Sequence, residues 1–452
     1  MINLKKIVVI GGGVATKGFL STALDFYEDI EITVVRRYER APVPCGIPYV
    51  IGTLNSADEN ISSDKNFIEK SVKFIIDEVV DIDLKDKKLS LKKEKDLAFD
   101  KLVIATGAKP VCLSIKGANL ENIMPIYKDV DYVKTIREKV ENAKDIVIIG
   151  GGFIGVELAD EISKLEGKNV SVIELARNCL FQVFDEEFCE NIESLLIKNG
   201  IKVYNKMGVQ EFRGENAVKE VVLSNGKIIK ADLVFLNIGA NPDIELAERA
   251  KLDITSMGNI AVDRFMRTSH PDVLAIGDCA SKLDFFSGKE SKIMLASVAA
   301  REGRIAADNL FNCNLQLEPF GVVSIFSTCI DGVYFGSAGL SEEGAKRCGY
   351  RCSVVNVETF DRHPKTLPDT NQLKAIFIFA QENGLLLGAQ LMGGIQVAEI
   401  ANIIGFAIQE RNTAIQLFGK VYGTHPLATS SPNHYIIHVA ARKMVKELRK
   451  SQ

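Results

Sequence analysis

The sequence has few cysteines, no long apolar run and almost no net charge. Nine cysteines among 452 residues are too sparse for the disulfide framework of a secreted domain. No apolar run reaches the roughly 18 residues that a membrane-spanning helix needs, and a net charge of −4 gives no basic surface for nucleic acid or an anionic membrane. The balance of 46% apolar and 25% charged residues excludes intrinsic disorder. We expect about three domains in a protein of the reducing cytoplasm.

Glycine is near its average abundance but is concentrated in a few clusters, two of which follow short apolar strands. Because the first strand is short and ends at three glycines, it predicts a buried strand rather than a signal peptide. Each cluster belongs to a unit of strand, glycine turn, helix and second strand. In the first unit these are Lys6–Ile10, Gly11–Gly13, a helix to about Tyr27 and Glu31–Val35; in the second they are Asp145–Ile149, Gly150–Gly155, a helix to about Leu165 and Asn169–Glu174.

The second turn is a complete dinucleotide fingerprint, Gly150-x-Gly152-x-x-Gly155. Its glycines permit a tight turn, close approach to a pyrophosphate and close helix–strand packing, and the helix N-terminus favours the anion. Glu174 is placed to accept from an adenosine ribose and to repel a 2′-phosphate. The pattern therefore predicts NADH binding, with Phe153 and Ile154 in the same turn, while Arg177 leaves NADPH open. The alternative is a glycine turn in an unrelated α/β domain.

The first turn is less regular. Gly11 and Gly13 fit the fingerprint and are followed by Val14-Ala15, but Thr16 stands where a third small residue is expected. The second strand ends in Arg36-Arg37, where a ribose-binding carboxylate is usual. An arginine there can donate to ribose hydroxyls, stack on adenine or read a 2′-phosphate. We therefore expect a second dinucleotide site whose adenosine contacts include Arg36 and Arg37.

Each half of the chain also repeats its ending. An apolar strand leads into Ala105-Thr106-Gly107, and a similar strand later leads into Gly239, while a third one ends at Gly277-Asp278. From about Leu315 the pattern changes to alternating segments, followed by an amphipathic helix near Val397–Glu410. These features predict an α/β protein with two Rossmann-like domains and a separate C-terminal α+β domain.

Cys45 stands in the proline-rich loop Pro42–Tyr49, which leads towards a helix. Helix N-terminal N–H groups lower the pKa of a nearby thiol, which raises its reactive fraction at neutral pH. The next cysteine is Cys112, so the chain lacks the paired cysteines of a dithiol reductase. Cys45 is therefore the candidate nucleophile. Its redox partner would be a small-molecule sulfur compound or an oxygen species, or it would have no redox partner at all. The alternative is an inert, buried cysteine.

The remaining cysteines and histidines show no paired metal-ligand spacing, and we predict no metal. Among the five histidines, His425 in a His-Pro loop is the candidate acid and base. A histidine with an ordinary pKa of ~6.5 can carry a thiol proton at neutral pH. The alternative is a histidine satisfied by its own loop.

With both glycine turns, the strand ends and the loop cysteine in this order, the chain resembles the FAD-dependent pyridine nucleotide-disulfide oxidoreductases. It is most similar to their single-cysteine branch, which includes NADH oxidases, NADH peroxidases, coenzyme A-disulfide reductases and polysulfide reductases. The resemblance implies an FAD domain from residues 1–112 and 243–315, an NAD domain from 113–242 and a dimerisation domain from 316–452. It also implies a homodimer.

The resemblance implies roles for individual residues. Asp278 would bond the flavin side chain, Ala296 would offer backbone to the flavin ring, and Val79 would face the adenine. Phe153 would form the aromatic gate over the nicotinamide pocket, with Glu157 beside it. The alternatives are ordinary: Phe153 could belong to the core, and Glu157 could be a first-turn acid stabilised by the helix dipole.

Three departures separate the chain from named subfamilies. NADH oxidases and peroxidases have a histidine in the first glycine loop, where this chain has Val14-Ala15. Coenzyme A-disulfide reductases have a tyrosine pair before Pro-Gly, where this chain reads His363–Asp369, and a tyrosine near the C-terminus. Here Tyr422–Leu427 is closer to the His-Pro of the glutathione reductase branch, in which the partner subunit's histidine serves the thiol as acid and base.

We therefore predict a homodimeric oxidoreductase with FAD and NADH, or NADPH, as cofactors, which reduces a disulfide, polysulfide or persulfide through Cys45. Its partners would be a small sulfur substrate and a second copy, with no nucleic acid and no membrane. One alternative is an NADH oxidase in which Cys45 becomes a sulfenate. Others are a flavoprotein that only signals its redox state and an electron donor to a small iron–sulfur protein.

Overall fold

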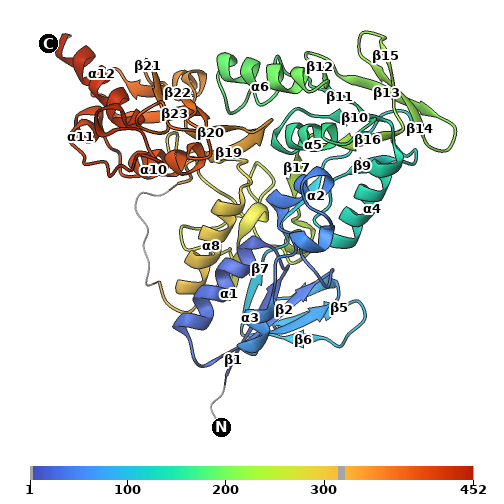
Figure 1. The fold of residues 1–452 in the computed structure, drawn as a ribbon. Helices are drawn as coiled ribbons and strands as arrows, with labels where there is room; N and C mark the ends of the chain where they lie inside the picture. The colour runs from blue at the N-terminus through green and yellow to red at the C-terminus, as the bar shows by residue number, and fades with distance from the viewer. Residues whose placement is uncertain (1–3, 314–320, 451–452) are drawn as a thin grey trace. The chain divides into compact units, whose positions relative to one another are not determined.

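The computed structural model describes residues 4–313 and 321–450, which alternate between helices and strands (Figure 1). The chain divides into two compact units. The first is built from Met1–Leu113, Met124–Asn142 and Ile238–Val322, and the second from Ser114–Ile123, Ala143–Asn237 and Val323–Gln452. Each unit therefore gathers segments that lie far apart in the sequence.

The first unit is built on a parallel sheet in the order β18-β7-β1-β2-β3. Alternate residues of β1 enter different cores, with Ile7 and Val9 in one cluster and Val8 and Ile10 in the other. A strand covered on both faces reads as a continuous apolar run, which is the pattern seen in the sequence. The strands are β1 (Lys5–Ile10), β2 (Ile30–Arg36), β3 (Lys73–Ile76), β7 (Lys101–Ile104) and β18 (Val273–Ala275).

Two helices distant in sequence, α1 (Val14–Phe26) and α8 (Ala296–Asp308), lie side by side in this unit (Figure 1). Glycines allow the contact: a Cβ on Gly18 would lie 2.5 Å from the Ala300 carbonyl oxygen, and one on Gly303 would lie 2.2 Å from that of Ala15. The close packing fixes the N-termini of both helices relative to the sheet.

Smaller elements complete the first unit. A three-stranded antiparallel sheet follows β3, and a two-stranded pair joins the segments on either side of residues 114–237. They are β4 (Val79–Asp83), β5 (Lys88–Leu91), β6 (Leu97–Ala98), β8 (Ala108–Pro110), β17 (Ala240–Pro242), α2 (Tyr49–Gly52), α3 (Lys65–Glu69), α4 (Val130–Asn142) and α7 (Glu245–Arg249).

The second unit contains a sheet of the same kind, in the order β12-β11-β10-β16, whose edge strand β9 begins at Ile123 of this unit, and a small antiparallel sheet of β13, β14 and β15. Helices α5 and α6 accompany these two sheets. The bounds are β9 (Ile123–Pro125), β10 (Asp145–Ile149), α5 (Phe153–Ser163), β11 (Asn169–Ile173), α6 (Glu186–Lys198), β12 (Lys202–Tyr204), β13 (Val209–Gly214), β14 (Val218–Leu223), β15 (Ile228–Lys230) and β16 (Leu233–Leu236).

The C-terminal part of the second unit is an antiparallel sheet, β19-β20-β23-β22-β21, with helices. The predicted fold class is thereby confirmed, and the predicted change of pattern near Leu315 lies outside the described residues. The bounds are β19 (Ile325–Ile330), β20 (Val333–Gly339), α9 (Glu342–Arg347), β21 (Cys352–Phe360), β22 (Gln372–Ala380), β23 (Leu386–Gly393), α10 (Val397–Gln409), α11 (Ala414–Phe418) and α12 (Ile436–Lys450).

Two kinds of feature are absent from the described residues. Over 4–313 and 321–450, no helix combines the length and apolar character needed to cross a membrane. Over the same ranges, no three or more His, Cys, Asp or Glu side chains are grouped so as to hold a metal ion.

Candidate active site

The first glycine turn packs closely against the end of β7, and the N-terminus of α1 that follows it has no side-chain cap. Gly11 has a φ of +108°, and a Cβ there would lie 2.1 Å from the Ala105 carbonyl oxygen, so only glycine fits. Thr16 donates its hydroxyl to the Gly11 carbonyl at 2.8 Å, which explains a threonine at this position. Gly13 precedes α1 without a side-chain cap and faces open space. The backbone N–H groups that begin at Val14 therefore remain available to an anion.

Arg36 folds beneath this turn. Its Nη1 lies 2.6 Å from Asp64, its guanidinium lies 4.7 Å from the Phe74 ring centre, and a Cβ on Gly12 would meet its side chain at 2.7 Å. The Arg36 side chain is only 9% exposed and pairs with Asp64, which also pairs with Lys17, so Arg36 is held in place and supports the loop. Arg37 is 47% exposed and lies 3.4 Å from Glu78. Of the two predicted adenosine contacts, Arg37 is the accessible one.

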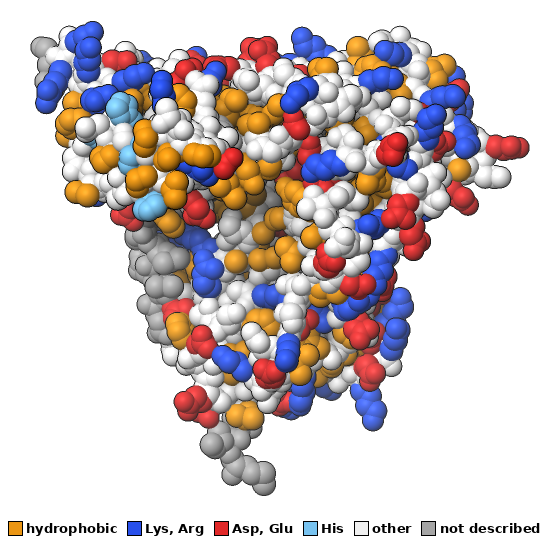
Figure 2. All heavy atoms as spheres, viewed as in Figure 1, with side chains coloured by type: hydrophobic (Ala, Val, Ile, Leu, Met, Phe, Trp, Pro, Cys, Tyr) orange, Lys and Arg blue, Asp and Glu red, His pale blue; other side chains and the backbone are white. Residues whose placement is uncertain are grey.

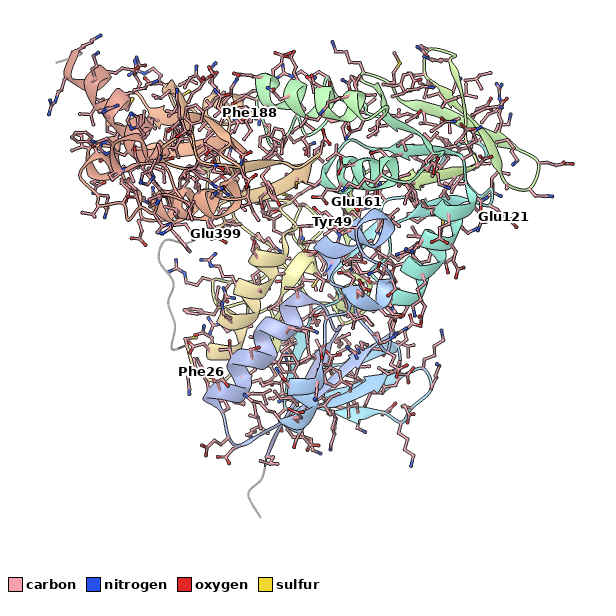
Figure 3. The ribbon with its side chains drawn as sticks, viewed as in Figure 1. Phe26, Tyr49, Glu121, Glu161, Phe188 and Glu399 are labelled. Carbon is pink, nitrogen blue, oxygen red and sulfur yellow. The ribbon has the colours of Figure 1, made fainter. Side chains whose placement is uncertain are left out.

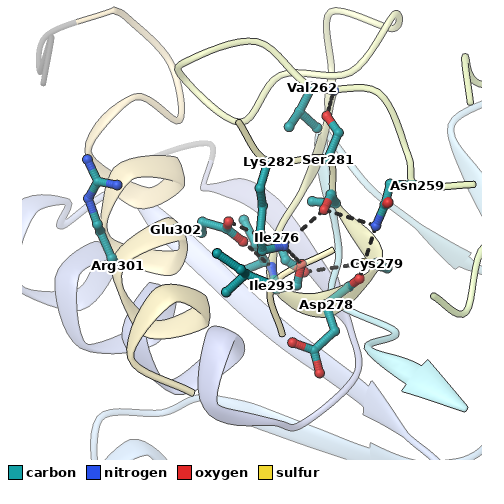
Figure 4. A network of polar contacts seen from close by, with 12 residues as sticks. Asn259, Val262, Ile276, Asp278, Cys279, Ser281, Lys282, Ile293, Arg301 and Glu302 are labelled. Carbon is teal, nitrogen blue, oxygen red and sulfur yellow. Dashed lines mark hydrogen bonds and ion pairs between the residues drawn. The ribbon is translucent and has the colours of Figure 1, made fainter. Parts of the chain in front are cut away.

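Asp278 lies in a backbone turn that is held by the buried side chains of Lys282 and Glu302 (Figure 4). Glu302 accepts from the Gly277 N–H at 2.7 Å, and the Lys282 ammonium donates to the carbonyls of Gly277 and Ala280 at 2.7 and 2.9 Å. Lys282 and Glu302 are themselves 3.4 Å apart, with side chains 2% and 5% exposed. Both ends of the turn are thus fixed by one buried ion pair.

The Asp278 carboxylate is less buried than the side chains of Lys282 and Glu302. It is 14% exposed and lies 3.2 Å from the ammonium of Lys128. Ala296 begins α8, which has no side-chain cap, so its backbone N–H is available as the resemblance implies. Burial raises the pKa of the Glu302 carboxyl, against the opposing effect of Lys282.

The repeated strand ends, at Ala105–Gly107 and at Gly239, lie close together in the first unit. Thr106 donates to the Asp243 carbonyl at 2.6 Å, and the Asp243 N–H donates to the Gly107 carbonyl at 2.9 Å. Gly239 has a φ of +100° and accepts from the Val111 N–H at 3.0 Å. Ala105, Thr106, Gly107 and Gly239 therefore belong to the crossover in which β8 pairs with β17.

Cys45 is exposed on a short 3-10 turn, Pro44–Gly46. Asn60 closes this loop from behind: its amide donates to the Val43 carbonyl at 3.0 Å, and its backbone carbonyl accepts from the Val43 N–H at 2.9 Å. A Cβ on Gly46 would lie 2.0 Å from Asn60 Oδ1, so glycine is required after the cysteine. The expected helix is a single turn that begins at Tyr49 (Figure 3), and its dipole is therefore small.

The second glycine turn repeats the geometry of the first. Gly150 has a φ of +102°, and a Cβ on Gly155 would lie 1.9 Å from the Gly150 carbonyl oxygen. Gly152 faces open space at the uncapped N-terminus of α5. The two carboxylate oxygens of Glu174 accept from the N–H groups of Gly151 and Ala176, each at 2.6 Å. Glu174 is thus held against the turn with its remaining lone pairs free for a ribose.

The first residues of α5 contact the C-terminal sheet. Phe153 stacks on Phe326 of β19 with ring centres 4.9 Å apart and planes 11° from parallel, while Ile154 is exposed. Thr328 of the same strand donates to Glu157 Oε1 at 2.7 Å. Desolvation of the carboxyl raises the pKa of Glu157 to about 7, although the Thr328 hydrogen bond acts in the opposite direction.

His425 is exposed in the loop before α12, where the Leu427 N–H donates to its Nδ1 at 3.3 Å. Its backbone carbonyl accepts from the Thr429 N–H at 3.0 Å, and its N–H donates to Thr429 Oγ1 at 2.9 Å. Because Nδ1 is an acceptor, the proton of the neutral ring lies on Nε2. The loop therefore presents a donating Nε2 to the surroundings.

Several residues around these sites were not found from the sequence: Asp64 under Arg36, Asn60 behind Cys45, the Lys282–Glu302 pair under Asp278, and Thr328 on Glu157. Apart from Lys282, which follows Asp278 by four residues, each lies far along the chain from the residue that it supports. No motif or spacing links them, so only the fold brings them together.

The turns and strand ends recur in known proteins. The pattern described as "Pyridine nucleotide-disulphide oxidoreductase" matches residues 5–303, and that of its dimerisation domain matches 325–435. An NADH oxidase of Methanocaldococcus jannaschii is 29% identical over 98% of this chain and 99% of its own length. An NAD(P)H coenzyme A polysulfide/persulfide reductase of Pyrococcus horikoshii is 31% identical over 86% and 87%, respectively. A solved NAD-dependent persulfide reductase from A. fulgidus shares 28% identity and a TM-score of 0.91, over 98% of this chain and 84% of that one.

Proposed function

Because the chain belongs to the pyridine nucleotide-disulphide oxidoreductase family, we propose that it reduces a disulfide, polysulfide or persulfide through Cys45. FAD and NAD(P)H are the cofactors of this enzyme family, and its dimerisation domain is present. When bound, FAD would supply the redox chemistry that links a hydride donor to a sulfur acceptor. The steps that follow concern what this chain's own residues contribute.

The first glycine turn and the turn of Asp278 fit FAD. The turn offers uncapped N–H groups at α1 and the open space at Gly13 to a pyrophosphate. In this proposal Asp278 would accept from the flavin side chain, Ala296 would supply backbone to its ring, and Arg37 with Val79 would face the adenosine. On this assignment the FAD domain consists of residues 1–112 and 243–315.

The second turn fits NADH. Its pyrophosphate is held at the N-terminus of α5, and Glu174 accepts from the ribose hydroxyls while repelling a 2′-phosphate. Phe153 and Glu157 line the nicotinamide end of this site. The NAD domain then consists of residues 113–242, followed by the dimerisation domain at 316–452.

Cys45 performs the sulfur chemistry. Its thiolate attacks the substrate RS–SR′, releases R′S⁻ and forms a Cys45–S–SR bond. Two electrons from NADH then break that bond, which regenerates the Cys45 thiolate and releases RS⁻. With two protons taken up by the thiolates, the sum is NADH + H⁺ + RSSR′ → NAD⁺ + RSH + R′SH. For a polysulfide or persulfide, one product is a hydrosulfide.

His425 of the partner subunit supplies the proton in this proposal. Its Nε2–H, defined by the Leu427 hydrogen bond, suits donation to a departing thiolate. Apolar side chains gather over the C-terminal elements with histidines among them (Figure 2). Phe406 is 67% exposed and Val421 is 96% exposed, and we propose that a second copy covers them.

The exposed Cys45 on its braced loop is the observation that carries this proposal. The relatives named persulfide and polysulfide reductases support the sulfur substrate. A second candidate, reduction of dioxygen with Cys45 as a sulfenate, is favoured by the relative named NADH oxidase and disfavoured by Val14-Ala15 in place of a loop histidine. We also propose a reducing cytoplasm, in which Cys45 returns to the thiol.

Cys45→Ser tests the assignment. The purified flavoprotein is reduced anaerobically with NADH and then given polysulfide, coenzyme A disulfide or dioxygen in separate experiments. We expect the variant to keep flavin reduction by NADH and to lose at least 100-fold of its polysulfide turnover, because the attacking sulfur is gone. Cys112→Ser, another exposed cysteine, serves as the matched control and should behave as wild type.

Unchanged polysulfide turnover in Cys45→Ser would contradict the proposal. Preferred turnover with dioxygen would establish the oxidase, slow turnover with every acceptor would indicate a signalling flavoprotein, and fast reduction of an added iron–sulfur protein would indicate an electron donor.

A further inference from the structure

The start of α5 and strand β19 face each other through matched pairs of residues. Phe326 and Thr328 are two apart on a strand, so they share one face, and Phe153 and Glu157 are four apart on a helix, so they share one face too. Phe326 stacks on Phe153, and Thr328 donates to Glu157 at 2.7 Å. The C-terminal sheet therefore contacts both candidate residues of the nicotinamide site, Phe153 and Glu157, through two neighbouring side chains on one face of β19.

Glu157 is half-buried among groups that mostly disfavour its negative charge. On its own helix lie the carboxylates of Asp160 and of Glu161, the latter labelled in Figure 3, and both are paired with Lys164. From β19 comes the Thr328 hydroxyl, whereas Cys329 of the same strand and Asp331 in the turn after it lie near Asp160. The Asp331 N–H donates to Asp160 at 3.1 Å, and the Asp331 carboxylate pairs with Lys198 of α6 at 2.9 Å.

The charged side chains near Glu157 thus form ion pairs with one another. Lys164 and Lys198 each pair with a carboxylate other than Glu157, whereas Thr328 is the hydroxyl donor bonded to Glu157. A hydroxyl that donates to a carboxylate stabilises its ionised form relative to its protonated form. Thr328 also fixes the direction in which Oε1 points, which leaves Oε2 for another contact.

We propose that Thr328 is a positioning residue of the hydride-transfer site, favouring the ionised form of Glu157 and orienting its carboxylate beside the nicotinamide. The inference rests on the proposed function, which places Glu157 at that end of the NADH site. Transfer of a hydride, one proton with two electrons, from NADH to oxidised FAD leaves a positive charge on the pyridinium ring of NAD⁺. An ionised carboxylate stabilises that developing charge, and a neutral carboxyl does not.

The pH dependence of flavin reduction tests the proposal. Anaerobic stopped-flow mixing with NADH measures the rate in wild type, Thr328→Val and Thr328→Ser. In wild type the rate should rise with pH through the titration of Glu157, whose pKa is about 7. Removing the hydroxyl should move the midpoint up by about one pH unit, a tenfold change in the proton dissociation constant. Thr328→Ser, which keeps the hydroxyl, should restore the wild-type midpoint.

Glu157→Gln identifies the titrating group. Its rate should be low and should lose the titration seen in wild type, because the amide does not ionise. Curves for Thr328→Val and wild type that superimpose would overturn the proposal. So would a Thr328→Val curve that is lower at every pH without a shifted midpoint, since that result is expected of a merely structural defect.

A second readout needs neither flavin nor turnover. Infrared difference spectra of the apoprotein report the carbonyl stretch of a protonated carboxyl, and the band lost in Glu157→Gln belongs to Glu157. In Thr328→Val that band should persist to higher pH than in wild type, and an unshifted band would refute the inference. Because both readouts are independent of Cys45, their failure is distinguishable from failure of the sulfur reduction proposed above.

Discussion

At the scale of single residues, the glycines of the second turn have different roles, one in ligand binding and one in folding. Gly152 faces open space, whereas a Cβ on Gly155 would lie 1.9 Å from the Gly150 carbonyl oxygen. The same motif therefore contains one glycine that the ligand requires and another that the helix–strand contact requires. A methyl group added at each position should have different consequences.

Gly152→Ala should fold normally and bind NADH at least tenfold more weakly, because the new methyl group occupies the space through which the pyrophosphate approaches. Gly155→Ala should lower the free energy of unfolding by about 1–3 kcal/mol, as expected of overpacking against backbone. Urea unfolding measures stability, and fluorescence titration measures NADH affinity. Equal loss of stability in the two variants would contradict this division of roles.

At the first turn, residue identity alone did not predict which of the two arginines is accessible to the adenosine. The sequence indicates Arg36 and Arg37 as adenosine contacts, and the two are equivalent in the pattern. The fold separates them, because Asp64 in a distant loop binds Arg36 beneath Gly12 and leaves Arg37 exposed. A partner that is 28 residues away in an irregular loop leaves no periodic signal.

At the scale of elements, the turn of Asp278 depends on α8. Glu302 of that helix and Lys282 form a nearly dry ion pair around the Gly277 peptide. Removing one member of a buried pair leaves the other charge without compensation, which is more damaging than removing both. The pair is therefore expected to couple helix packing to the shape of the turn.

Glu302→Gln should reduce the free energy of unfolding by about 3–5 kcal/mol, because the Lys282 ammonium then remains buried without its counter-ion. The double variant Lys282→Met with Glu302→Leu should recover part of that loss. Chemical denaturation of the apoprotein measures both. If Glu302→Gln unfolds at the same urea concentration as wild type, the pair does not hold the turn.

Whole elements were the part of the fold that the sequence predicted best. Both strand–turn–helix–strand units and the helix at Val397–Gln409 follow from apolar periodicity and glycine position, which are local signals. The pairing of β8 with β17 and the α1–α8 contact were not predictable in the same way. They join segments more than 100 residues apart, and small residues such as Gly18 and Gly303 mark the contact only after it is known.

At the scale of the whole molecule, the proposed active site requires two copies of the chain. Cys45 belongs to the first unit and His425 to the second. Apolar side chains of the C-terminal part, among them Phe406 and Val421, are exposed, and we propose that the second copy covers them. If the partner subunit's His425 serves Cys45, two differently inactivated subunits should complement each other.

Co-expression of Cys45→Ser and His425→Ala subunits with different affinity tags gives mixed dimers that can be purified. One of their two sites combines an intact Cys45 with an intact His425 of the partner subunit, so activity should return to about half of the wild-type value per dimer. Homodimers of either variant, purified from the same cells, are the control and should have much lower polysulfide turnover. If the two residues instead act within one chain, every site of the mixed dimer lacks one of them, and its turnover should be no higher than the average of the two homodimers.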